Sequence, residues 1–235
     1  MAIKKQRAVR RTDALSKERI VESAIEILDS EGEGALTFRA LAARLATGSG
    51  AIYWHVANKD DLLAAATNDV IARVMADLPG GARPREAIRA LALGLFDAID
   101  AHPWVGTQLS RAPWLAAIPQ IFEGFGSRLE GLGVPEGAQF DATSTLVIHV
   151  LGVAGQNAAN ARLHAHRTDR TAFLGEIARQ WTRLDPARYP FVHRVAAQLP
   201  EHDDREQFLA GIDLILGGIE AAHIEAAHPG PSPRT

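Results

Sequence analysis

One short segment carries residues that could recognise DNA. Residues 37–59 read TFRALAARLATGSGAIYWHVANK. Two short helical patterns separated by a glycine-bearing turn are typical of a helix-turn-helix, whose second helix fits the DNA major groove. Tyr53, Trp54 and His55 follow with flat side chains that can hydrogen-bond at the groove wall. Lys59 opens the next helix, where its charge and the helix N-terminus could both contact a phosphate.

Helical periodicity surrounds this segment and extends along nearly the whole chain. Ser16, Thr37 and Asn58 each precede an apolar pattern of helical spacing, so we expect them to cap three helices. No alternating strand pattern and no internal repeat stands out, which predicts an all-α fold. The other helices are expected near residues 84–101, 140–164, 171–183, 189–199 and 205–228, with a shorter aromatic-rich stretch between 104 and 125.

The composition is that of an ordinary globular protein. The chain has 235 residues, of which 47% are hydrophobic and 23% charged. It contains no cysteine, which excludes a disulfide scaffold, a thiolate zinc site and a cysteine nucleophile. No apolar run is long enough to cross a membrane, and the basic start is not followed by the apolar segment of a secretory signal. We therefore expect a cytoplasmic protein.

The charge is unevenly distributed, which indicates two units with different partners. Lys4, Lys5, Arg7, Arg10 and Arg11 precede the first acid, whereas the chain beyond residue 60 holds more acidic than basic residues. A basic start suits contact with a polyanion, although a solvated basic tail would look the same. The expected division is a basic arm and helix-turn-helix at 1–60, a helical effector-binding and dimerisation domain at 61–228, and a disordered tail at 229–235.

The helix-turn-helix segment resembles the tetracycline-repressor (TetR) family. The residues that carry the resemblance are Leu41-Ala42-x-x-Leu45, Gly50-Ala51-Ile52-Tyr53-Trp54-His55-Val56, Asn58-Lys59 and Leu62-Leu63. More weakly, the closing stretch at residues 208–220 is similar to the dimerisation helix of that family. The resemblance implies an N-terminal three-helix bundle joined to a larger helical ligand-binding and dimerisation domain. It also implies a homodimeric transcriptional regulator, most often a repressor, that a small molecule releases from a palindromic operator.

The same resemblance assigns DNA contacts to individual residues. Contacts with phosphates are implied for Thr37, Tyr53 and Lys59. The positions nearest the bases are implied to be Ser49, Gly50, Ala51 and Trp54. His55 is expected to brace the helix or touch the backbone, and Arg39 and Arg44 are phosphate candidates on charge alone.

The turn departs from the family pattern. It reads Ala46-Thr47-Gly48-Ser49, so a glycine displaces the usual capping residue. We therefore expect Ser49 to cap the second helix, which would run from about Ala51 to His55. A capping role makes Ser49 a doubtful base reader.

Aromatic residues gather in the second half of the chain together with a few polar ones. Such a mixture is typical of ligand pockets, although an aromatic stripe at helical spacing is also typical of an ordinary core. The candidate ligand-binding residues are Trp104, Gln108, Trp114, Phe122, Phe125, His149, Gln156, Asn157 and Trp181. Leu109 and Gln156 stand where tetracycline binders of the family hold a metal with a histidine and an acid. Tetracycline is therefore disfavoured, and an apolar or aromatic effector is expected.

Two helices are expected to form the interface of a homodimer. The helix near 144–164 is rich in glycine and alanine, which let a neighbouring helix approach closely. With the helix near 205–228, it would build a four-helix interface, although the same small face could serve internal packing. A dimer is expected because two recognition helices read a palindrome better than one.

No residue pattern indicates an enzyme, a metal centre or a bound cofactor. The motifs of serine hydrolases, nucleotide-binding loops and zinc proteases do not occur. His164, His166 and Asp169 form the best cluster for a metal, but exposed loop histidines explain them better. Two alternatives stay open, which are a DNA-binding factor without an effector and a helical protein that only binds a small molecule.

Overall fold

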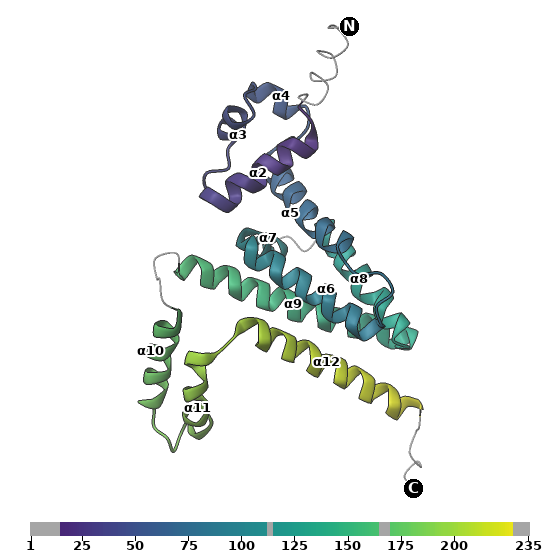
Figure 1. The fold of residues 1–235 in the computed structure, drawn as a ribbon, viewed down its shortest axis with the longest axis vertical. Coiled ribbons are helices and arrows are strands. Elements are labelled where there is room, and N and C mark those ends of the chain that lie inside the picture. Colours follow the sequence, from purple (N-terminus) through teal and green to yellow (C-terminus); the bar gives the residue numbers. More distant parts are fainter. Residues whose placement is uncertain (1–14, 112–114, 165–169, 228–235) are drawn as a thin grey trace.

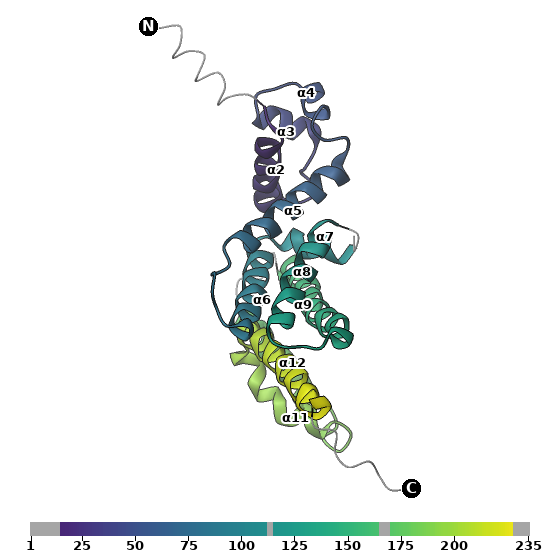
Figure 2. The ribbon, with the colours of Figure 1, turned by 90° about the vertical axis from the view of Figure 1, so that its right-hand side faces the viewer.

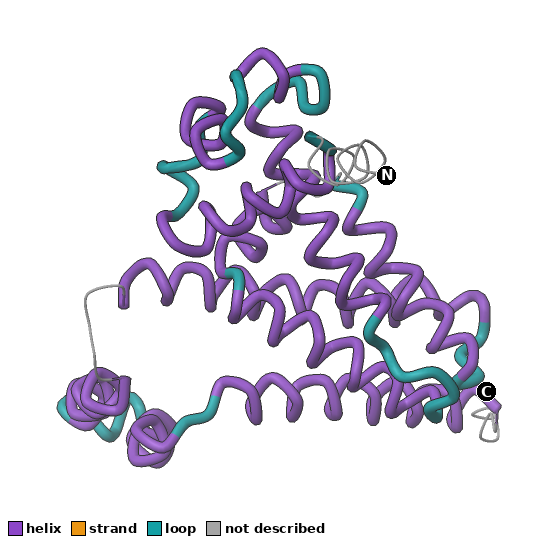
Figure 3. The backbone as a smooth tube through the Cα atoms, turned by 45° about the horizontal axis from the view of Figure 1, so that its top comes forward, coloured by secondary structure: helices purple, strands orange, loops and turns teal. Residues whose placement is uncertain are grey.

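The computed structural model describes residues 15–111, 115–164 and 170–227, and in these ranges the ordered elements are helices without a strand (Figure 3). The all-α prediction is confirmed. The elements are α2 Lys17–Glu31, α3 Phe38–Arg44, α4 Ser49–Tyr53, α5 Lys59–Ala76, α6 Pro84–Ala101, α7 Pro103–Arg111, α8 Ala117–Gly131, α9 Glu136–His164, α10 Arg170–Thr182, α11 Pro190–Val195, the 3-10 helix η1 Ala196–Glu201 and α12 Asp204–Ala227. The basic arm and the tail at 229–235 lie outside the described residues.

Three side-chain caps start the helices of the N-terminal unit, as the sequence predicts. The Ser16 hydroxyl accepts a hydrogen bond from the backbone N–H of Arg19 at 3.3 Å. Thr37 and Asn58 cap α3 and α5 in the same way, with distances of 3.0 and 2.8 Å. Each cap satisfies a backbone donor that the first helical turn leaves free. At the other end of α2, Gly32 takes a φ of 80°, a left-handed conformation that glycine adopts without strain.

The start of α4 differs from the prediction. The helix begins at Ser49, two residues earlier than expected, and Gly48 is its N-cap without a side-chain hydrogen bond. Ser49 thus lies inside the first turn, and its predicted capping role is wrong. The reason is the preceding turn, where Ala46 takes a left-handed φ of 49° and Thr47 N–H donates to the carbonyl of Ala42 at 2.9 Å.

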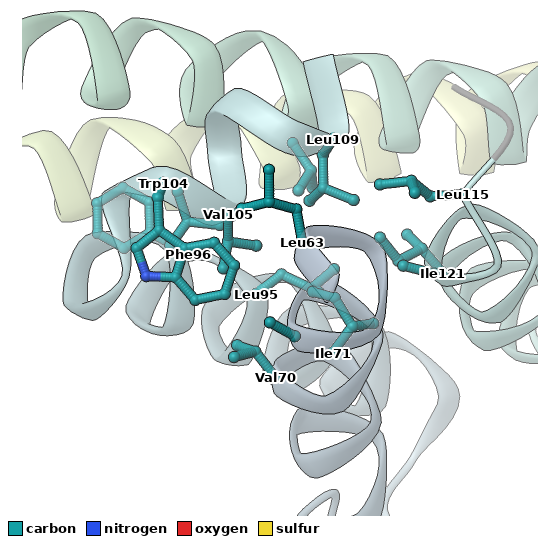
Figure 4. Close-up of a cluster of buried hydrophobic side chains, with 14 of the residues drawn as sticks. Leu63, Val70, Ile71, Leu95, Phe96, Trp104, Val105, Leu109, Leu115 and Ile121 are labelled. Atoms are coloured by element: carbon teal, nitrogen blue, oxygen red, sulfur yellow. The ribbon is translucent and has the colours of Figure 1, made fainter. Parts of the chain in front are cut away.

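Helix α5 joins the N-terminal unit to the larger helical part. It packs against α2 at one end and against α6, α7 and α8 at the other, as the two ribbon views show (Figures 1 and 2). Leu62, Ala66 and Ile71 are buried along its length. In the second half, α5 side chains meet those of α6, α7 and α8 in a common core (Figure 4). One helix therefore takes part in both units.

Aromatic stacking fastens α12 to its neighbours α6 and α9. The ring of Phe208 stacks on Phe96 at 5.0 Å and on His149 at 5.3 Å between centroids. Gly211, one turn later on α12, lets the two helices approach closely. A Cβ added at Gly211 would lie only 2.5 Å from Cε1 of the His149 ring.

Ion pairs between α6 and α12 also stabilise the packing of α12. Arg85 contacts both carboxylate oxygens of Glu220 at 2.7 Å, and Arg89 pairs with Asp213. The hydrogen bond from Arg89 holds the pKa of Asp213 below its usual value, and the bond to Glu220 raises the pKa of Arg85. These groups are partly exposed, so each pair stabilises the helix contact only modestly.

Helices α10 and α11 and the short η1 form a separate outlying group. They pack against one another, and both Figure 1 and Figure 3 place them at the far ends of α9 and α12 from α5. The aromatic side chain of Phe191 in α11 is 63% exposed. This group therefore contributes little to the core that surrounds α5.

Replacing Gly211 with alanine should destabilise the protein. The added methyl group would overlap His149, which costs about 1–3 kcal/mol. The better helix propensity of alanine returns roughly 1 kcal/mol of this. Gly175→Ala in α10 is the control, because its Cβ would meet only the end of the Arg179 side chain at 3.8 Å. Urea unfolding measures both free energies, and an equal or greater stability of Gly211→Ala would contradict the close approach.

Candidate DNA-contact surface and its junction with the helical core

Two aromatic residues at the end of α4 lie on the surface. Tyr53 stacks on Phe38 at the start of α3, with 4.3 Å between ring centroids and an interplanar angle of 4°. Tyr53 is nevertheless 55% exposed, and the next residue, Trp54, is 90% exposed. Single exposed apolar residues are common, whereas adjacent ones form a surface that a partner can contact. The stack fixes the direction in which α4 ends.

The residues expected nearest the bases all lie on α4 or directly after it. Gly50 and Trp54 are exposed, whereas Ser49 and Ala51 are half-buried. His55, which is expected to brace the helix or touch the backbone, is exposed as well. Ile52 is the buried residue that anchors this short helix to the core. The structure therefore collects the predicted base-contacting positions on one element.

The residues expected to contact phosphates differ in how they are held. The amine of Lys59 donates to the backbone carbonyl of Glu33 at 2.6 Å, which ties the first turn of α5 to the loop after α2. Arg44 pairs with Glu26 at 2.9 Å, so its charge is partly compensated. Thr37 and Arg39 are exposed at the start of α3. Of these cations, Arg39 is the more accessible and Lys59 the more firmly positioned.

A polar junction connects this unit to α7. Oδ1 of Asp29, near the end of α2, accepts from the Trp104 indole N–H at 2.8 Å and contacts Nδ1 of His102 at 2.7 Å. Two residues of α7 also reach Glu33, with Gln108 Nε2 at 3.4 Å and Arg111 at 3.6 Å. The end of α2 and the following loop thus rest on the α6–α7 corner. We call these contacts the Asp29–Glu33 junction.

Sequence reasoning missed Asp29, Glu33 and His102. Asp29 and His102 are separated by 73 positions in the chain, and neither belongs to a recognisable motif. The only local signal is that acids close α2 and that Trp104 needs a hydrogen-bond partner if its indole is buried. That signal predicts a hydrogen-bond acceptor near Trp104 but does not indicate which residue supplies it.

The predicted ligand-binding residues whose side chains are described lie on the four helices α7, α8, α9 and α10. Trp104 and Gln108 belong to the Asp29–Glu33 junction, and His149 is stacked on Phe208. Phe125 is fully buried in α8, where Phe122 is half-buried. Gln156 is exposed on α9, and Trp181 is half-buried on α10. Trp114 and the side chain of Asn157 lie outside the described residues. A ligand role for this set stays a prediction.

The candidate metal cluster of His164, His166 and Asp169 lies largely outside the residues that the structure describes. Residues 165–169 and the side chain of His164 are not described. Among the described residues, no three histidine or acidic side chains come close enough to hold a metal ion. A search of the same residues finds no helix with the length and apolar character needed to span a membrane.

Comparison with known proteins places this geometry in a family. The profile described as "Bacterial regulatory proteins, tetR family" matches residues 20–66. The profile described as "Tetracyclin repressor-like, C-terminal domain" matches residues 79–223, more than half of the chain. The chain belongs to the TetR family. The resemblance seen in the helix-turn-helix segment is thereby confirmed and extends over the larger helical part.

Curated relatives support the same assignment. The chain is 30% identical over 224 residues to the HTH-type transcriptional repressor DrrR1 of Streptomyces coeruleorubidus, covering 88% of this chain and 77% of that one. It is 35% identical over 99 residues to an HTH-type transcriptional regulator of Saccharopolyspora erythraea. That match spans 42% of each chain, so it covers less than half of the relative's length.

Solved structures of TetR proteins share the fold. A TetR transcriptional regulator from Streptomyces coelicolor is 51% identical, with a TM-score of 0.81 over 89% of this chain and 100% of that one. The TetR family protein ActR of the same organism, in complex with actinorhodin, is 25% identical, with a TM-score of 0.74 over 88% and 96% of the two chains. The family is therefore matched by fold as well as by sequence.

Replacing Asp29 with alanine should loosen the contact between the TetR DNA-contact unit and α7. The change removes the acceptor of the buried Trp104 N–H, and an unsatisfied buried donor costs about 1–3 kcal/mol. Asp100→Ala, at an exposed aspartate of α6, is the matched control and should change stability by less than about 0.5 kcal/mol. Unfolding followed by tryptophan fluorescence measures both, and an equal loss in the two variants would show that Asp29 has no special role.

Proposed function

We propose that the protein is a homodimeric transcriptional regulator that binds a palindromic DNA operator and is released by a small molecule. The observation that carries the proposal is the exposed end of α4, where Trp54 stands 90% exposed beside Tyr53 in a TetR helix-turn-helix. A regulator rather than an enzyme is favoured by the relatives, which are named as transcriptional regulators and repressors. Repression and a cytoplasmic location are part of the proposal.

The proposed DNA contacts divide into positioning and reading. Helix α4 would enter the major groove, with Gly50 and Trp54 towards the base edges. Thr37, Arg39 and Lys59 would contact phosphates, which fix the register of the protein on the duplex. The hydrogen bond from Lys59 to the Glu33 carbonyl supports this role, because it holds the charged amine beside the first turn of α5. The amine has two further N–H groups to offer to a phosphate.

The proposed dimer interface consists of the exposed faces of α9 and α12. On α9, exposed residues recur at helical spacing as Asp141, Thr145, Ile148 and Gly152. On α12, the corresponding exposed stripe consists of Ala210, Leu214, Gly217, Gly218 and Ala221. Ile148 is 68% exposed and Leu214 is 78% exposed. An exposed large apolar side chain on each helix, with small residues beside it, suits a four-helix interface between two copies of the chain.

The effector is proposed to be apolar or aromatic and to act through α5. ActR, a structural neighbour, is described in complex with actinorhodin, so a TetR fold of this shape accommodates a small molecule in that protein. In the present chain, α5 packs in both units, so a change in the larger core would tilt the helix-turn-helix. A ligand can drive release only if its affinity differs between the bound and released arrangements.

DNA binding should depend on salt, and substitutions of Lys59 and Trp54 should affect it in different ways. A titration against the DNA flanking the coding region tests this at two salt concentrations, because six to ten phosphate contacts lose about 10^3–10^5 in affinity between 50 and 200 mM salt. Lys59→Ala should weaken binding to all sequences alike and lower the salt slope by about 1. Trp54→Ala should instead change which sequence is preferred.

Two distant variants serve as controls for this titration. Arg183→Ala and Phe191→Ala remove an exposed charge and an exposed aromatic ring in the outlying α10–α11 group, and both should bind DNA as the wild type does. Binding that is indifferent to salt and sequence would overturn the regulator proposal. An equal loss across all sequences in Lys59→Ala and Trp54→Ala would overturn the reading role of Trp54.

A charge on the exposed face of α12 should break the dimer. Leu214→Glu would place a carboxylate in the apolar interface, where an unpaired charge is strongly disfavoured. Leu184→Glu, in the loop after α10, adds the same charge away from the proposed interface. Analytical ultracentrifugation should find a monomer for Leu214→Glu and a dimer for the wild type and Leu184→Glu. A Leu214→Glu variant that remains a dimer would place the interface elsewhere.

A further inference from the structure

A cavity of about 280 Å³ lies between α5 and α6. None of the aromatic residues predicted to bind a ligand lines it. Its walls are mostly apolar, with Val70, Val74 and Leu78 on the side of α5. Ligand sites for small molecules are concave and mostly apolar with a few polar groups, and this volume is near the lower end of their range.

The cavity exists because α6 presents small residues on this face. Ala90, Gly94 and Ala98 recur every four residues and line the cavity together. A Cβ at Gly94 would lie 2.9 Å from a methyl group of Val74, so the two helices touch at this point. The alanines on either side are too short to fill the space that larger residues would occupy. The hollow is therefore set by side-chain size at fixed helix spacing.

Polar groups at the edge of the cavity limit what can bind. Arg73 and Asp77 on α5 line it, and Arg73 is already paired with Asp69 at 2.6 Å. Part of the charge of this arginine is therefore already compensated. The third polar group is His102, the residue that follows α6 and contacts Asp29.

The hydrogen bond of His102 determines the chemistry of its other nitrogen. A carboxylate oxygen accepts hydrogen bonds, so the 2.7 Å contact with Asp29 pairs with the tautomer that carries its proton on Nδ1 of His102. In the uncharged ring, Nε2 is then an acceptor. A ligand that pairs with it must bring an O–H or N–H donor.

From these contacts we infer that the α5–α6 cavity binds a small aromatic molecule with one hydrogen-bond donor, and that its occupation disturbs the Asp29–Glu33 junction through His102. The ring fits the apolar walls of α5 and α6. The donor pairs with the nitrogen of His102 that Asp29 leaves free. The cavity thus contacts a residue that is itself bound to the DNA-contact unit.

The link to DNA binding runs through the shared oxygen of Asp29. His102 and Trp104 contact the same Oδ1 atom, so a shift of His102 changes the position of α2 relative to α7. The loop after α2 carries Glu33, whose carbonyl holds Lys59. Cavity occupation therefore alters the placement of a proposed phosphate contact. This second step rests on the proposed function as a DNA-binding regulator.

The binding step is tested with indole as the probe and calorimetry as the measurement. Indole has an aromatic ring system and one N–H donor, whereas indene has a similar shape without the donor. Wild-type protein should bind indole more tightly than indene by about fivefold, the effect of a hydrogen bond of roughly 1 kcal/mol. Absence of indole binding, or equal binding of the two probes, overturns the proposed ligand chemistry.

Cavity-filling variants locate the site. Ala90→Trp should abolish indole binding by occupying the space, whereas Ala72→Trp, on the exposed face of α5, should leave it unchanged. Ala98→Leu is a smaller replacement that should weaken binding if Ala90→Trp fails to fold, as judged by circular dichroism. Indole binding that survives in the folded cavity-filling variants overturns the assignment to this cavity.

The coupling step is tested separately on DNA. Indole should weaken the binding of the wild type to DNA flanking its coding region, and Ala90→Trp should be insensitive to indole. If the wild type binds DNA and indole binds the cavity without changing DNA affinity, the coupling through His102 is wrong while the regulator function stands. If the wild type binds no DNA with sequence preference, the proposed function fails, and calorimetry still decides whether the cavity is a site.

Discussion

The continuity of α5 is the constraint on which the arrangement of the molecule depends. Its first turn holds Lys59 in the DNA-contact unit, and its second half buries Val70 and Ile71 in the larger core (Figure 4). Eighteen residues of unbroken helix cannot bend at low cost, because each interior turn is closed by backbone hydrogen bonds. A displacement of one end therefore tilts the other. No flexible linker separates the two units along α5.

The Asp29–Glu33 junction adds polar contacts between the two units to the packing along α5. The His102–Asp29 contact is partly exposed, so its strength in water is modest. The buried N–H of Trp104 is different, because it loses its partner if the junction opens. A few polar contacts of limited strength are compatible with the proposed release, in which the contact between the two units changes. A large apolar interface at this place would lock the two units together.

Local signals made much of the helical fold predictable, and their limits follow from the same physics. Ser16, Thr37 and Asn58 act as caps through hydrogen bonds that span three residues, so the sequence alone predicts them. The start of α4 depends on a left-handed alanine at position 46, a conformation that residue type does not indicate. The Asp29–His102 contact joins distant positions and has no pattern to predict it.

Side-chain size decides whether a helix face fills the core or leaves a cavity. Large rings such as Phe125 and Trp104 are most often used to fill space, and here they are buried among other helices. A cavity requires the opposite, which is residues too small to fill the gap between two rigid helices. In this chain Ala90, Gly94 and Ala98 supply that gap, on a helix whose other face carries the core residues Leu91 and Leu95. Helical spacing predicts that these small residues share one face of α6. The cavity forms only because α5 lies opposite that face, which the sequence does not indicate.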